Sequence, residues 1–241
     1  MQHLNSKELI VVVPVYNEAG ILKIFAEDWI ELLNRLNIDF VFRFYNDGSK
    51  DESGLLLDEL ASSYPQIEVI HKPNSGHGST LIQAYKESNG AEWVFQIDSD
   101  HELDHYVFQS FWEERKAYDV LLGERIKEKQ TGVFRKFLSA LSSFSIRIFF
   151  GSGIKDSNCP YRLIRSEVLQ LSLKMIPANC FAPNVLLSAL FVKEKRRIKV
   201  FQVKQHFRKP RTGTGFSVMM LKGAINTFVY LLRLKLSLRN N

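Results

Sequence analysis

Short apolar runs alternate with helical patterns through the first 100 residues, and this alternation restricts the fold more than any other feature of the chain. The apolar runs, rich in β-branched and aromatic residues, lie at residues 9–15, 40–45, 67–71 and 93–97. Helical patterns follow at residues 19–36, from 51 to about 63 and, after a loop over 72–78, up to about residue 89. Near-continuous apolar strands that alternate with helices are typical of a parallel sheet covered on both faces. We therefore predict an α/β, Rossmann-like half over about residues 8–100.

The second half of the chain is less regular, and no linker separates it from the first. Residues 118–122 and 196–207 predict two further strands. Residues 133–150 are expected to form a helix because apolar side chains recur there at three- and four-residue steps. A final helix is expected from about residue 216 to 238. We predict a single domain over residues 1–215, whose second half covers about 101–215, and a C-terminal amphipathic helix within 216–241.

Composition restricts the partners and the compartment. The chain has 241 residues, of which 45% are hydrophobic and 24% charged, as in ordinary globular proteins. A formal net charge of +6 and an isoelectric point near 9.2 favour an anionic partner such as a nucleotide, a lipid phosphate or a membrane surface. Cys159 and Cys180 form neither a metal-ligand pattern nor a disulfide framework, which fits a reducing, cytoplasmic setting.

We expect no targeting segment and no membrane-spanning segment. The apolar run at residues 9–13 is too short and wrongly flanked for a signal peptide. Near the C-terminus the uncharged stretch covers only residues 223–232, well short of the roughly 20 residues that a spanning helix needs. The expected location is therefore the cytoplasm, with contact at the cytoplasmic face of a membrane as a hypothesis.

Two carboxylates, Asp98 and Asp100, follow the apolar run at residues 93–97, where a buried strand would emerge from the core. In a parallel α/β sheet, ligands bind at the carboxyl ends of the strands. Hard oxygen ligands at that edge suit a divalent cation that bridges substrate phosphates. The alternative is an ordinary polar turn, since Asp and Ser are common turn residues.

Polar residues also follow the other three strands predicted in the first half, at residues 14–18, 46–51 and 74–78. In a parallel sheet all of these loops lie along one edge. Each loop alone is a weak signal, because turns have the same composition and a lone glycine pair is poor evidence for phosphate binding. The chain also lacks the Lys-Ser/Thr ending of a P-loop and the glycine triplet of the dinucleotide fingerprint, which argues against an ATPase and a dehydrogenase.

Taken together, these motifs resemble those of the family-2 glycosyltransferases with a GT-A fold, and more closely the polyprenyl-phosphate sugar transferases of the dolichol-phosphate mannose synthase type. The resemblance covers roughly residues 8–220. In the first half it is carried by Pro-x-Tyr-Asn-Glu at 14–18, Asp-Gly-Ser-x-Asp at 47–51, Asn-x-Gly-x-Gly at 74–78 and Asp-x-Asp at 98–100. In the second half it is carried by Gly-Glu-Arg at 123–125, Arg-x-x-x-Ser at 135–139, Asp156 with Tyr-Arg at 161–162, and residues 206–217.

The resemblance implies a GT-A fold with a mostly parallel central sheet, a nucleotide-sugar half and an acceptor half. It implies that Pro14, Tyr16, Glu18 and Asp47 line the nucleotide base and ribose, while Gly76 allows close approach of the backbone. It further implies that Asp98 and Asp100 serve the diphosphate, with Asp100 the more direct ligand to Mg²⁺ or Mn²⁺ and Glu102 as a candidate third ligand. Such a metal neutralises charge that grows on the leaving group. Asn46 stands where relatives usually have an acid.

The acceptor implied by the resemblance is a polyprenyl phosphate. Arginines grip phosphate through two hydrogen bonds and keep their charge, so clusters of them suit such an acceptor. The alternative is that a basic protein scatters arginines over its surface. Helix 133–150 has the aromatic and basic composition of an interfacial helix, although packing on the sheet would explain its pattern equally well. The candidate phosphate ligands are Arg125, Arg135, Arg162 and Arg211, with Arg208 beside them.

The nature of the acceptor decides whether a catalytic base is needed. A sugar hydroxyl has to lose a proton, whereas a lipid phosphate is already anionic. Asp156 is the first candidate base and His206 the second. Our leading hypothesis is an inverting, metal-dependent transfer of a sugar from a nucleoside-diphosphate sugar to a polyprenyl phosphate. The rivals are transfer to a saccharide hydroxyl, a nucleotidyltransferase and a non-catalytic nucleotide-binding protein. We expect no nucleic-acid partner, and the oligomeric state stays open.

Overall fold

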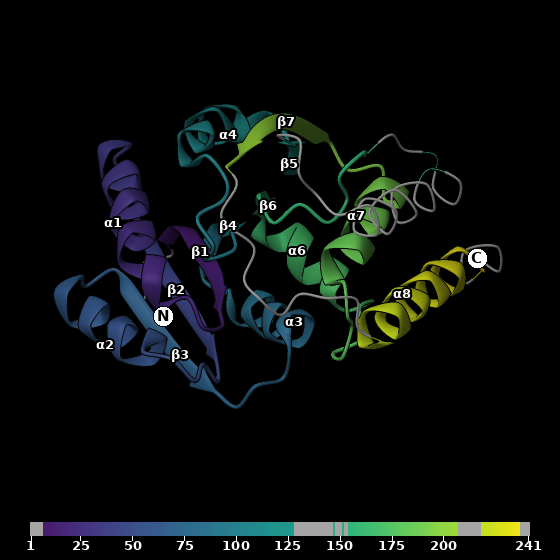
Figure 1. Cartoon of the computed structure of the whole chain (residues 1–241). Coiled ribbons are helices and arrows are strands. Elements are labelled where there is room, and N and C mark those ends of the chain that lie inside the picture. The colour runs from purple at the N-terminus through teal and green to yellow at the C-terminus, as the bar shows by residue number, and fades with distance from the viewer. Residues whose placement is uncertain (1–6, 128–146, 148–150, 152–153, 207–217, 237–241) are drawn as a thin grey trace, which may run out of the picture.

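Seven strands form a single sheet in the computed structural model, which describes residues 7–127, 147, 151, 154–206 and 218–236 (Figure 1). Their order in the sheet is β3-β2-β1-β4-β6-β5-β7. Among these strands β6 alone is antiparallel to its neighbours, β4 and β5, so the predicted mostly parallel sheet is confirmed. The strands are β1 (Lys7–Val15), β2 (Phe40–Asp47), β3 (Ile67–Lys72), β4 (Ala91–Gln96), β5 (Val120–Lys127), β6 (Arg162–Arg165) and β7 (Ile198–Gln205).

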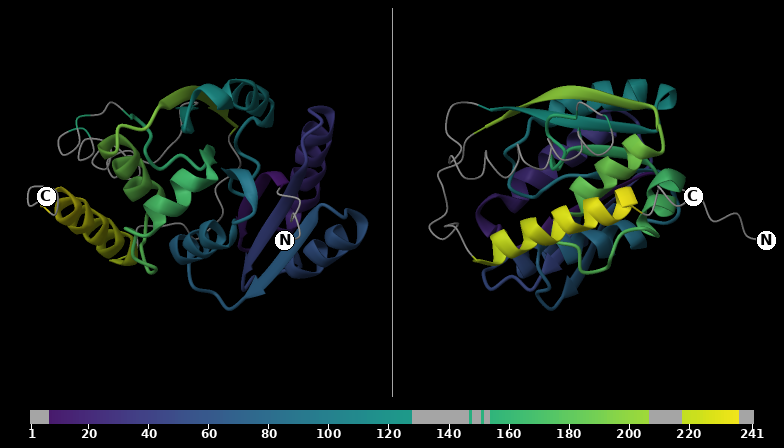
Figure 2. Two further views of the ribbon diagram at one scale, coloured as in Figure 1. Left: turned by 180° about the vertical axis from the view of Figure 1, so that it is seen from behind. Right: turned by 90° about the vertical axis from the view of Figure 1, so that its right-hand side faces the viewer.

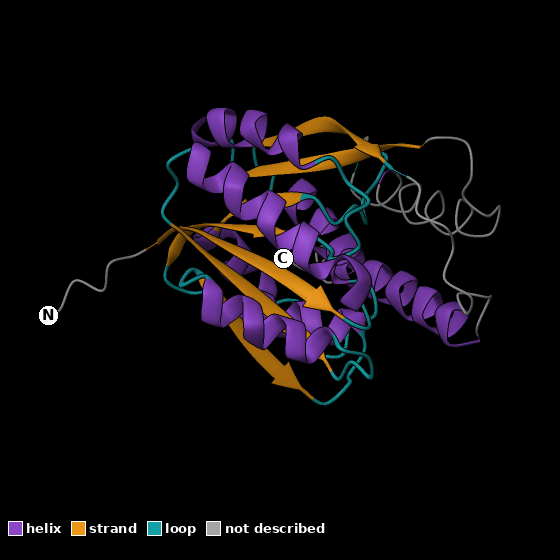
Figure 3. Ribbon diagram, turned by 60° about the vertical axis from the view of Figure 1, so that its left-hand side comes forward, coloured by secondary structure: helices purple, strands orange, loops and turns teal. Residues whose placement is uncertain are grey.

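The central strand β1 is apolar on both faces because helices cover the sheet on both sides (Figures 1 and 3). Leu9, Val11 and Val13 belong to one buried cluster, whereas Ile10 and Val12, which point the opposite way, belong to another. The first cluster is completed by α1 (Ala19–Arg35), α2 (Ser53–Ser63) and α4 (Phe108–Glu114). The second is completed by α3 (His77–Glu87), α6 (Ser166–Leu173) and α7 (Pro183–Lys193).

The order of the strands explains why helices lie on both faces. The chain moves outward from β1 through β2 to β3 and then returns by way of α3 to β4, on the other side of β1. Because crossovers between parallel strands are right-handed, this reversal places α3 on the face opposite α1 and α2. The pairs Val15↔Asn46 and Asn46↔His71 bring the carboxyl ends of β1, β2 and β3 to one edge. The loops that follow them therefore share that edge, as predicted.

The C-terminal helix α8 (Val218–Leu236) lies at the periphery of the molecule and packs against α7 (Figure 2). Leu231 and Leu234 of α8 are buried, whereas Ile225 and Phe228 are exposed. The predicted helix over about 216–238 is thus confirmed. None of the helices in the described part of the chain is long and apolar enough to cross a membrane.

The structure also contains elements that the sequence patterns do not predict. β6 has only four residues, and α7 is buried all round from Pro183 to Phe191, so neither shows a two- or 3.6-residue period. β5 continues past Leu122 to Lys127, which places Arg125 within a strand. The helix predicted at 133–150 lies almost wholly outside the described residues.

Candidate functional site

Hydrogen bonds join the loop after β1 to the loop after β2. The backbone N–H of Asn17 donates to Ser49 Oγ (3.0 Å), and that of Lys50 donates to Asn17 Oδ1 (2.7 Å). The N–H of Glu18 donates to Ser53 Oγ (2.8 Å). Glu18 stands at the N-cap position of α1, whose end lacks a side-chain cap of its own, so Ser53, the first residue of α2, supplies an acceptor there. The two loops therefore form one rigid unit.

The first loop presents Tyr16 at the carboxyl edge of the sheet. Its side chain is 44% exposed although it follows a strand that is buried from Leu9 to Val15, which leaves the ring open to a ligand. Its neighbour Glu18 is half-buried. The carbonyl of Pro14 accepts a hydrogen bond from Ser99 Oγ (3.0 Å), so the ends of β1 and β4 are fixed relative to each other. Exposed aromatic rings at such positions can stack on a planar base.

The carboxylate of Asp47 organises the loop after β3. It accepts hydrogen bonds from the Lys72 ammonium, from the backbone N–H of Ser75 (2.8 Å) and from that of Gly76 (3.0 Å). Burial alone would raise the pKa of Asp47, but the hydrogen bonds from Lys72 and Ser75 outweigh it and hold the pKa below its usual value. Asp47 is almost fully buried, so its clearest role here is to hold the loop after β3 in shape through Ser75 and Gly76.

Two glycines shape the turn into α3. Gly76 has φ +85°, a conformation that favours glycine. Gly78 has no room for a side chain, since a Cβ atom there would lie 2.2 Å from the Cys180 carbonyl oxygen. The start of α3 is therefore pressed against the chain at residues 180–181. The neighbouring His77 ring lies with its Nε2 3.9 Å from Asp98 Oδ1.

The two predicted metal ligands follow β4. Asp98 Oδ1 accepts a hydrogen bond from Gln96 Nε2 (3.0 Å), and Asp100 Oδ1 accepts one from the Glu102 N–H (3.1 Å). Both acidic side chains are partly exposed at the carboxyl edge of the sheet. Glu102 is held differently, because its Oε2 accepts a hydrogen bond from Gln205 Nε2 (2.6 Å) on β7. The loop after β4 thus spans from the acid pair to the far edge of the sheet.

A buried polar network, absent from our predictions, sets the position of Gln96. Asn184 Nδ2 donates to Gln96 Oε1 (3.1 Å), and the Tyr85 hydroxyl donates to Asn184 Oδ1 (2.9 Å). Burial, with the nearby Asp98 charge as a smaller contribution, raises the pKa of Tyr85, which stays protonated and can donate. An amide inside the apolar helix α7 is a signal in the sequence, because buried polar groups need partners. The network orients Gln96, and through it Asp98.

Arg125 and Asp156 form an ion pair next to this acid cluster. Arg125 Nε lies 2.7 Å from Asp156 Oδ2, and Nη2 lies 2.9 Å from Oδ1. Burial alone would lower the pKa of Arg125, but the hydrogen bonds to Asp156 outweigh burial and hold the pKa above its usual value. The charge of Asp98 also raises this pKa. Arg125 therefore keeps its charge and lies within the field of Asp98. The predicted base, Asp156, uses both oxygens to hold that arginine.

Arg162 lies in the interior, which does not fit the expected contact with an acceptor phosphate. Its side chain is 1% exposed, and its guanidinium donates to the carbonyls of Ser157 (2.6 Å) and Cys159 (3.0 Å) and to Ser188 Oγ (2.5 Å). These contacts tie the loop before β6 to α7. The other predicted phosphate ligands, Arg135 and Arg211, lie outside the described residues, as does Arg208. His206 lies beside the Glu102 carbonyl, to which its N–H donates (2.7 Å).

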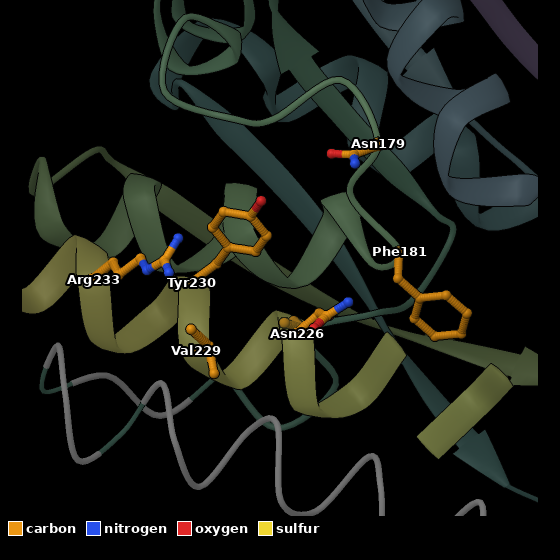
Figure 4. A pocket seen from close by; sticks show the side chains of 7 residues that line it. Asn179, Phe181, Asn226, Val229, Tyr230 and Arg233 are labelled. Carbon is orange, nitrogen blue, oxygen red and sulfur yellow. The ribbon is translucent and has the colours of Figure 1, made fainter. Parts of the chain in front are cut away.

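A cavity of about 170 Å³ lies between α8 and the chain near Phe181. Figure 4 shows the Phe181 side chain at one end and Asn226, Tyr230 and Arg233 of α8 along it. A Cβ atom at Gly223 would lie 2.3 Å from the Phe181 ring, so this ring packs directly on the α8 backbone. Because the carbonyl of Phe181 also contacts Gly78, one residue connects α8 to the start of α3.

Comparison with known proteins agrees with this architecture. Residues 10–171 match the family model described as glycosyl transferase family 2. The undecaprenyl-phosphate 4-deoxy-4-formamido-L-arabinose transferase of Pectobacterium atrosepticum is 26% identical over 208 residues, which cover 83% of this chain and 61% of that protein. The dolichyl-phosphate beta-glucosyltransferase ALG5C of Trichomonas vaginalis is 25% identical over 248 residues, covering 95% of this chain and 71% of that protein.

Solved structures of glycosyltransferases share the fold. Mannosyl-3-phosphoglycerate synthase from Rubrobacter xylanophilus superposes with a TM-score of 0.65 at 11% identity, covering 98% of this chain and 76% of that one. Glucosyl-3-phosphoglycerate synthase from Mycobacterium tuberculosis, in complex with Mn²⁺ and UDP-glucose, superposes with a TM-score of 0.59 at 16% identity, covering 95% and 79%. The fold is thus of the GT-A type, and because the family model matches residues 10–171, the chain belongs to glycosyl transferase family 2.

Proposed function

We propose that the chain transfers a sugar, with inversion and with the help of a divalent cation, from a nucleoside-diphosphate sugar to a polyprenyl phosphate. The observation that carries this proposal is the position of the Asp98 and Asp100 carboxylates at the carboxyl edge of the sheet, where the charge of Asp98 acts on the Arg125 cation. Acids there suit a metal-bound diphosphate, and a cation beside them suits a second phosphate. The names of the relatives, which act on undecaprenyl and dolichyl phosphate, support this choice of acceptor.

Asp98 and Asp100 fit a Mg²⁺ or Mn²⁺ ion, because both offer partly exposed oxygen donors from a loop fixed at several points. Such an ion neutralises the charge that develops on the diphosphate as the bond to the sugar breaks. Glu102 belongs to the same loop, but its hydrogen bond to Gln205 would have to be kept or exchanged on binding. We therefore assign the ion to the two aspartates and leave Glu102 as a candidate third ligand.

The nucleotide would lie over the loops that follow β1, β2 and β3. The exposed ring of Tyr16 suits stacking on the base, and the partly buried Glu18 suits a hydrogen bond to base or ribose. Pro14 and Asp47 hold these loops in place. The Pro14 carbonyl accepts a hydrogen bond from Ser99, and the Asp47 carboxylate accepts one from Ser75. Gly76 lets the backbone approach closely.

In the reaction, an oxygen of the acceptor phosphate attacks the anomeric carbon while the bond from that carbon to the diphosphate oxygen breaks. A single displacement of this kind inverts the anomeric configuration and releases the nucleoside diphosphate. The acceptor oxygen is already anionic, so no side chain has to remove a proton from it. The ion pair of Asp156 with Arg125 agrees with this, because a carboxylate held through both oxygens is a poor base. Arg125 would position the phosphate, with Arg135 and Arg211 as further proposed ligands.

A lipid acceptor has to be met at a membrane surface, and α8 supports such contact. Its outward residues Ile225 and Phe228 are exposed, and Lys222 and Arg233 are exposed on the same helix. Apolar and basic residues together suit the surface of an anionic bilayer. We therefore propose a peripheral position on the membrane.

A panel assay tests the proposed reaction. The full chain is incubated with UDP-, GDP- or dTDP-sugars, Mn²⁺ and a polyprenyl phosphate, and both the glycolipid and the released nucleotide are measured. We expect equal amounts of the two products with one donor class, and neither product with the Asp100→Ala variant. Nucleotide release that does not depend on the lipid, or transfer only to a free saccharide, would contradict the proposed acceptor.

A further inference from the structure

Three potential metal ligands lie close together beside the loop that carries Asp98 and Asp100. Asp28 lies on α1, and His101 and His105 lie on the segment that follows Asp100. One ligand atom from each of the three side chains lies within 4.8 Å of the other two. His101 Nε2 is already 3.2 Å from Asp28 Oδ2, about the separation of two ligands around one small ion.

We propose that Asp28, His101 and His105 bind a divalent transition-metal ion of the zinc type, at a site distinct from Asp98 and Asp100. Two imidazoles and one carboxylate form the donor set that Zn²⁺ and its neighbours prefer. The aspartate pair offers oxygen donors alone and suits Mg²⁺ or Mn²⁺. The two sites therefore differ in the chemistry of their ligands and can be told apart by the metal that each selects.

The surroundings hold the two imidazoles in place. The fully buried ring of Phe25 meets His101 edge-on, with ring centroids 5.9 Å apart, and Trp29 lies 6.0 Å from His105. The two imidazole rings stack on each other at 6.0 Å. Phe25 and Trp29 lie within one helical turn of Asp28 on α1. This turn therefore supplies one proposed ligand, Asp28, and the two aromatic rings that contact His101 and His105. Side chains that are held in place favour metal binding, because they lose less conformational freedom when the ion binds.

The backbone on either side of the proposed ligands is also constrained. His101 has φ +55°, a conformation that non-glycine residues rarely adopt. The carbonyl of His105 accepts a hydrogen bond from the buried Tyr161 hydroxyl (3.3 Å). Strained backbone conformations are kept where the surrounding structure over-determines them, and they cluster at functional sites. With this backbone conformation the His101 side chain reaches Asp28 on α1.

A small cavity adjoins the cluster and leaves room for a fourth ligand. Its volume is about 30 Å³, and Asp28, Glu31 and His105 are among the residues that line it. Roughly 10–15 Å³ of such volume holds one water molecule. A water molecule can therefore complete four-coordination. Arg35 also lines the cavity, so the two carboxylates there, Asp28 and Glu31, exceed the one nearby cation by one negative charge.

An ion at this site would join α1 to the loop that carries the acid pair. His101 follows Asp100 directly, so fixing its imidazole also limits the movement of the Asp100 backbone. The proposed site thus provides a structural clamp for a catalytic loop, and it does not depend on the identity of donor or acceptor.

Cobalt spectroscopy tests the site without an activity measurement. The full chain, free of any affinity tag and stripped with a chelator, is titrated with Co²⁺ in the presence of excess Mg²⁺, and Zn²⁺ is then used to displace it. We expect one equivalent with the visible absorption of tetrahedral Co²⁺, displaced by Zn²⁺. Asp28→Asn and His105→Gln should each weaken Co²⁺ binding by more than about tenfold, since losing even an outer-shell partner commonly costs 10- to 100-fold.

Matched variants separate this site from ordinary surface chemistry. His71 also lies beside a carboxylate, with Nε2 3.0 Å from Asp58 Oδ1, but belongs to no such cluster among the described residues. His71→Gln and Asp98→Asn should leave the Co²⁺ spectrum and affinity unchanged, with circular dichroism confirming that all variants fold. An octahedral or absent spectrum in the wild-type protein would overturn the proposal. Equal affinity in Asp28→Asn, His105→Gln and His71→Gln would overturn it as well.

Discussion

The guanidinium of Arg125 and the carboxylate of Asp156 bind each other through two parallel contacts, Nε to Oδ2 at 2.7 Å and Nη2 to Oδ1 at 2.9 Å. This arrangement uses two of the five N–H donors of the arginine and both oxygens of the aspartate. The arginine can still bind an anion with its other donors, whereas the aspartate would have to break the pair to accept a proton. This geometry fits the roles that we propose, in which Arg125 binds an anion and Asp156 positions Arg125.

Asp156→Asn is therefore expected to reduce turnover far less than Asp100→Ala. Asparagine can still accept a hydrogen bond from Arg125, so we expect kcat to fall by less than about tenfold, with a larger effect on KM for the acceptor. Loss of Asp100 removes charge stabilisation of the leaving group, which typically costs about 100-fold or more. Steady-state rates at varied polyprenyl phosphate concentration measure both effects. An equal collapse of kcat in the two variants would point to a base and a hydroxyl acceptor.

The depressed pKa of Asp47 predicts a loss of stability in acid. Its folded-state pKa lies below its usual value, so its contribution is fully present above the unfolded pKa, which is 3.8, and is lost as the pH falls through the folded pKa. Between about pH 6 and about pH 2, the free energy of unfolding should therefore fall more steeply in the wild-type protein than in Asp47→Asn. Urea denaturation at several pH values measures this difference.

Asp39→Asn provides the control for that experiment. Asp39 pairs with Lys7 at 2.6 Å, but both side chains are exposed, and exposed pairs contribute little. Its removal should leave the acid dependence close to that of the wild-type protein. If Asp47→Asn and Asp39→Asn gave the same curve, the buried contacts of Asp47 would not be a source of acid sensitivity.

The parts of the fold that the sequence predicts are those in which one residue type repeats along a single element. β1 and β4 are apolar on both faces, and polar residues follow each of them, so their position and the common edge follow from pattern and topology. The sequence does not predict the partner of a buried polar residue, because the partner is distant in the chain. Tyr85 and Asn184 are 99 positions apart, and the sequence around one of them does not indicate that the other is its partner.

Arg162 illustrates the same limit within the candidate site. A charged residue is normally exposed, which makes an arginine in a family motif a natural phosphate ligand. The structure instead pairs Nε and Nη2 of its guanidinium with the carbonyls of Cys159 and Ser157, and these lie within reach only because the chain turns back into β6. Asp28 and His101 likewise meet only in the folded chain, across 73 positions.

Gly78→Ala should destabilise the protein although alanine is the better helix former. Alanine within a helix is favoured over glycine by about 1 kcal/mol. At Gly78, however, its Cβ would lie 2.2 Å from the Cys180 carbonyl oxygen, and overpacking of this kind costs about 1–3 kcal/mol. We therefore expect a lower free energy of unfolding, measured by urea denaturation at neutral pH.

Gly54→Ala is a matched control, because Gly54 is likewise the second residue of an 11-residue helix. A Cβ there would approach only side-chain atoms, of which Asn46 Nδ2 is the nearest at 3.2 Å. This variant should be neutral or slightly stabilised. A stabilised Gly78→Ala variant would mean that the loop at residues 180–181 moves away without cost.

Reversing the charges on α8 should release the protein from anionic membranes. Lys222 and Arg233 are exposed on the helix that also carries the exposed Phe228. A basic residue near an anionic surface contributes about 1 kcal/mol, so changing Lys222 and Arg233 together to Glu should lower partitioning about 30-fold or more. Flotation with anionic vesicles at low salt measures this. Lys86→Glu with Lys174→Glu makes the same charge change at exposed positions on other elements and should retain most of the binding. If both double variants weakened membrane association equally, the association would reflect net charge alone. If only the α8 variant weakened it, α8 would lie on the membrane side of the molecule, together with the Phe181 ring that packs on its first turns.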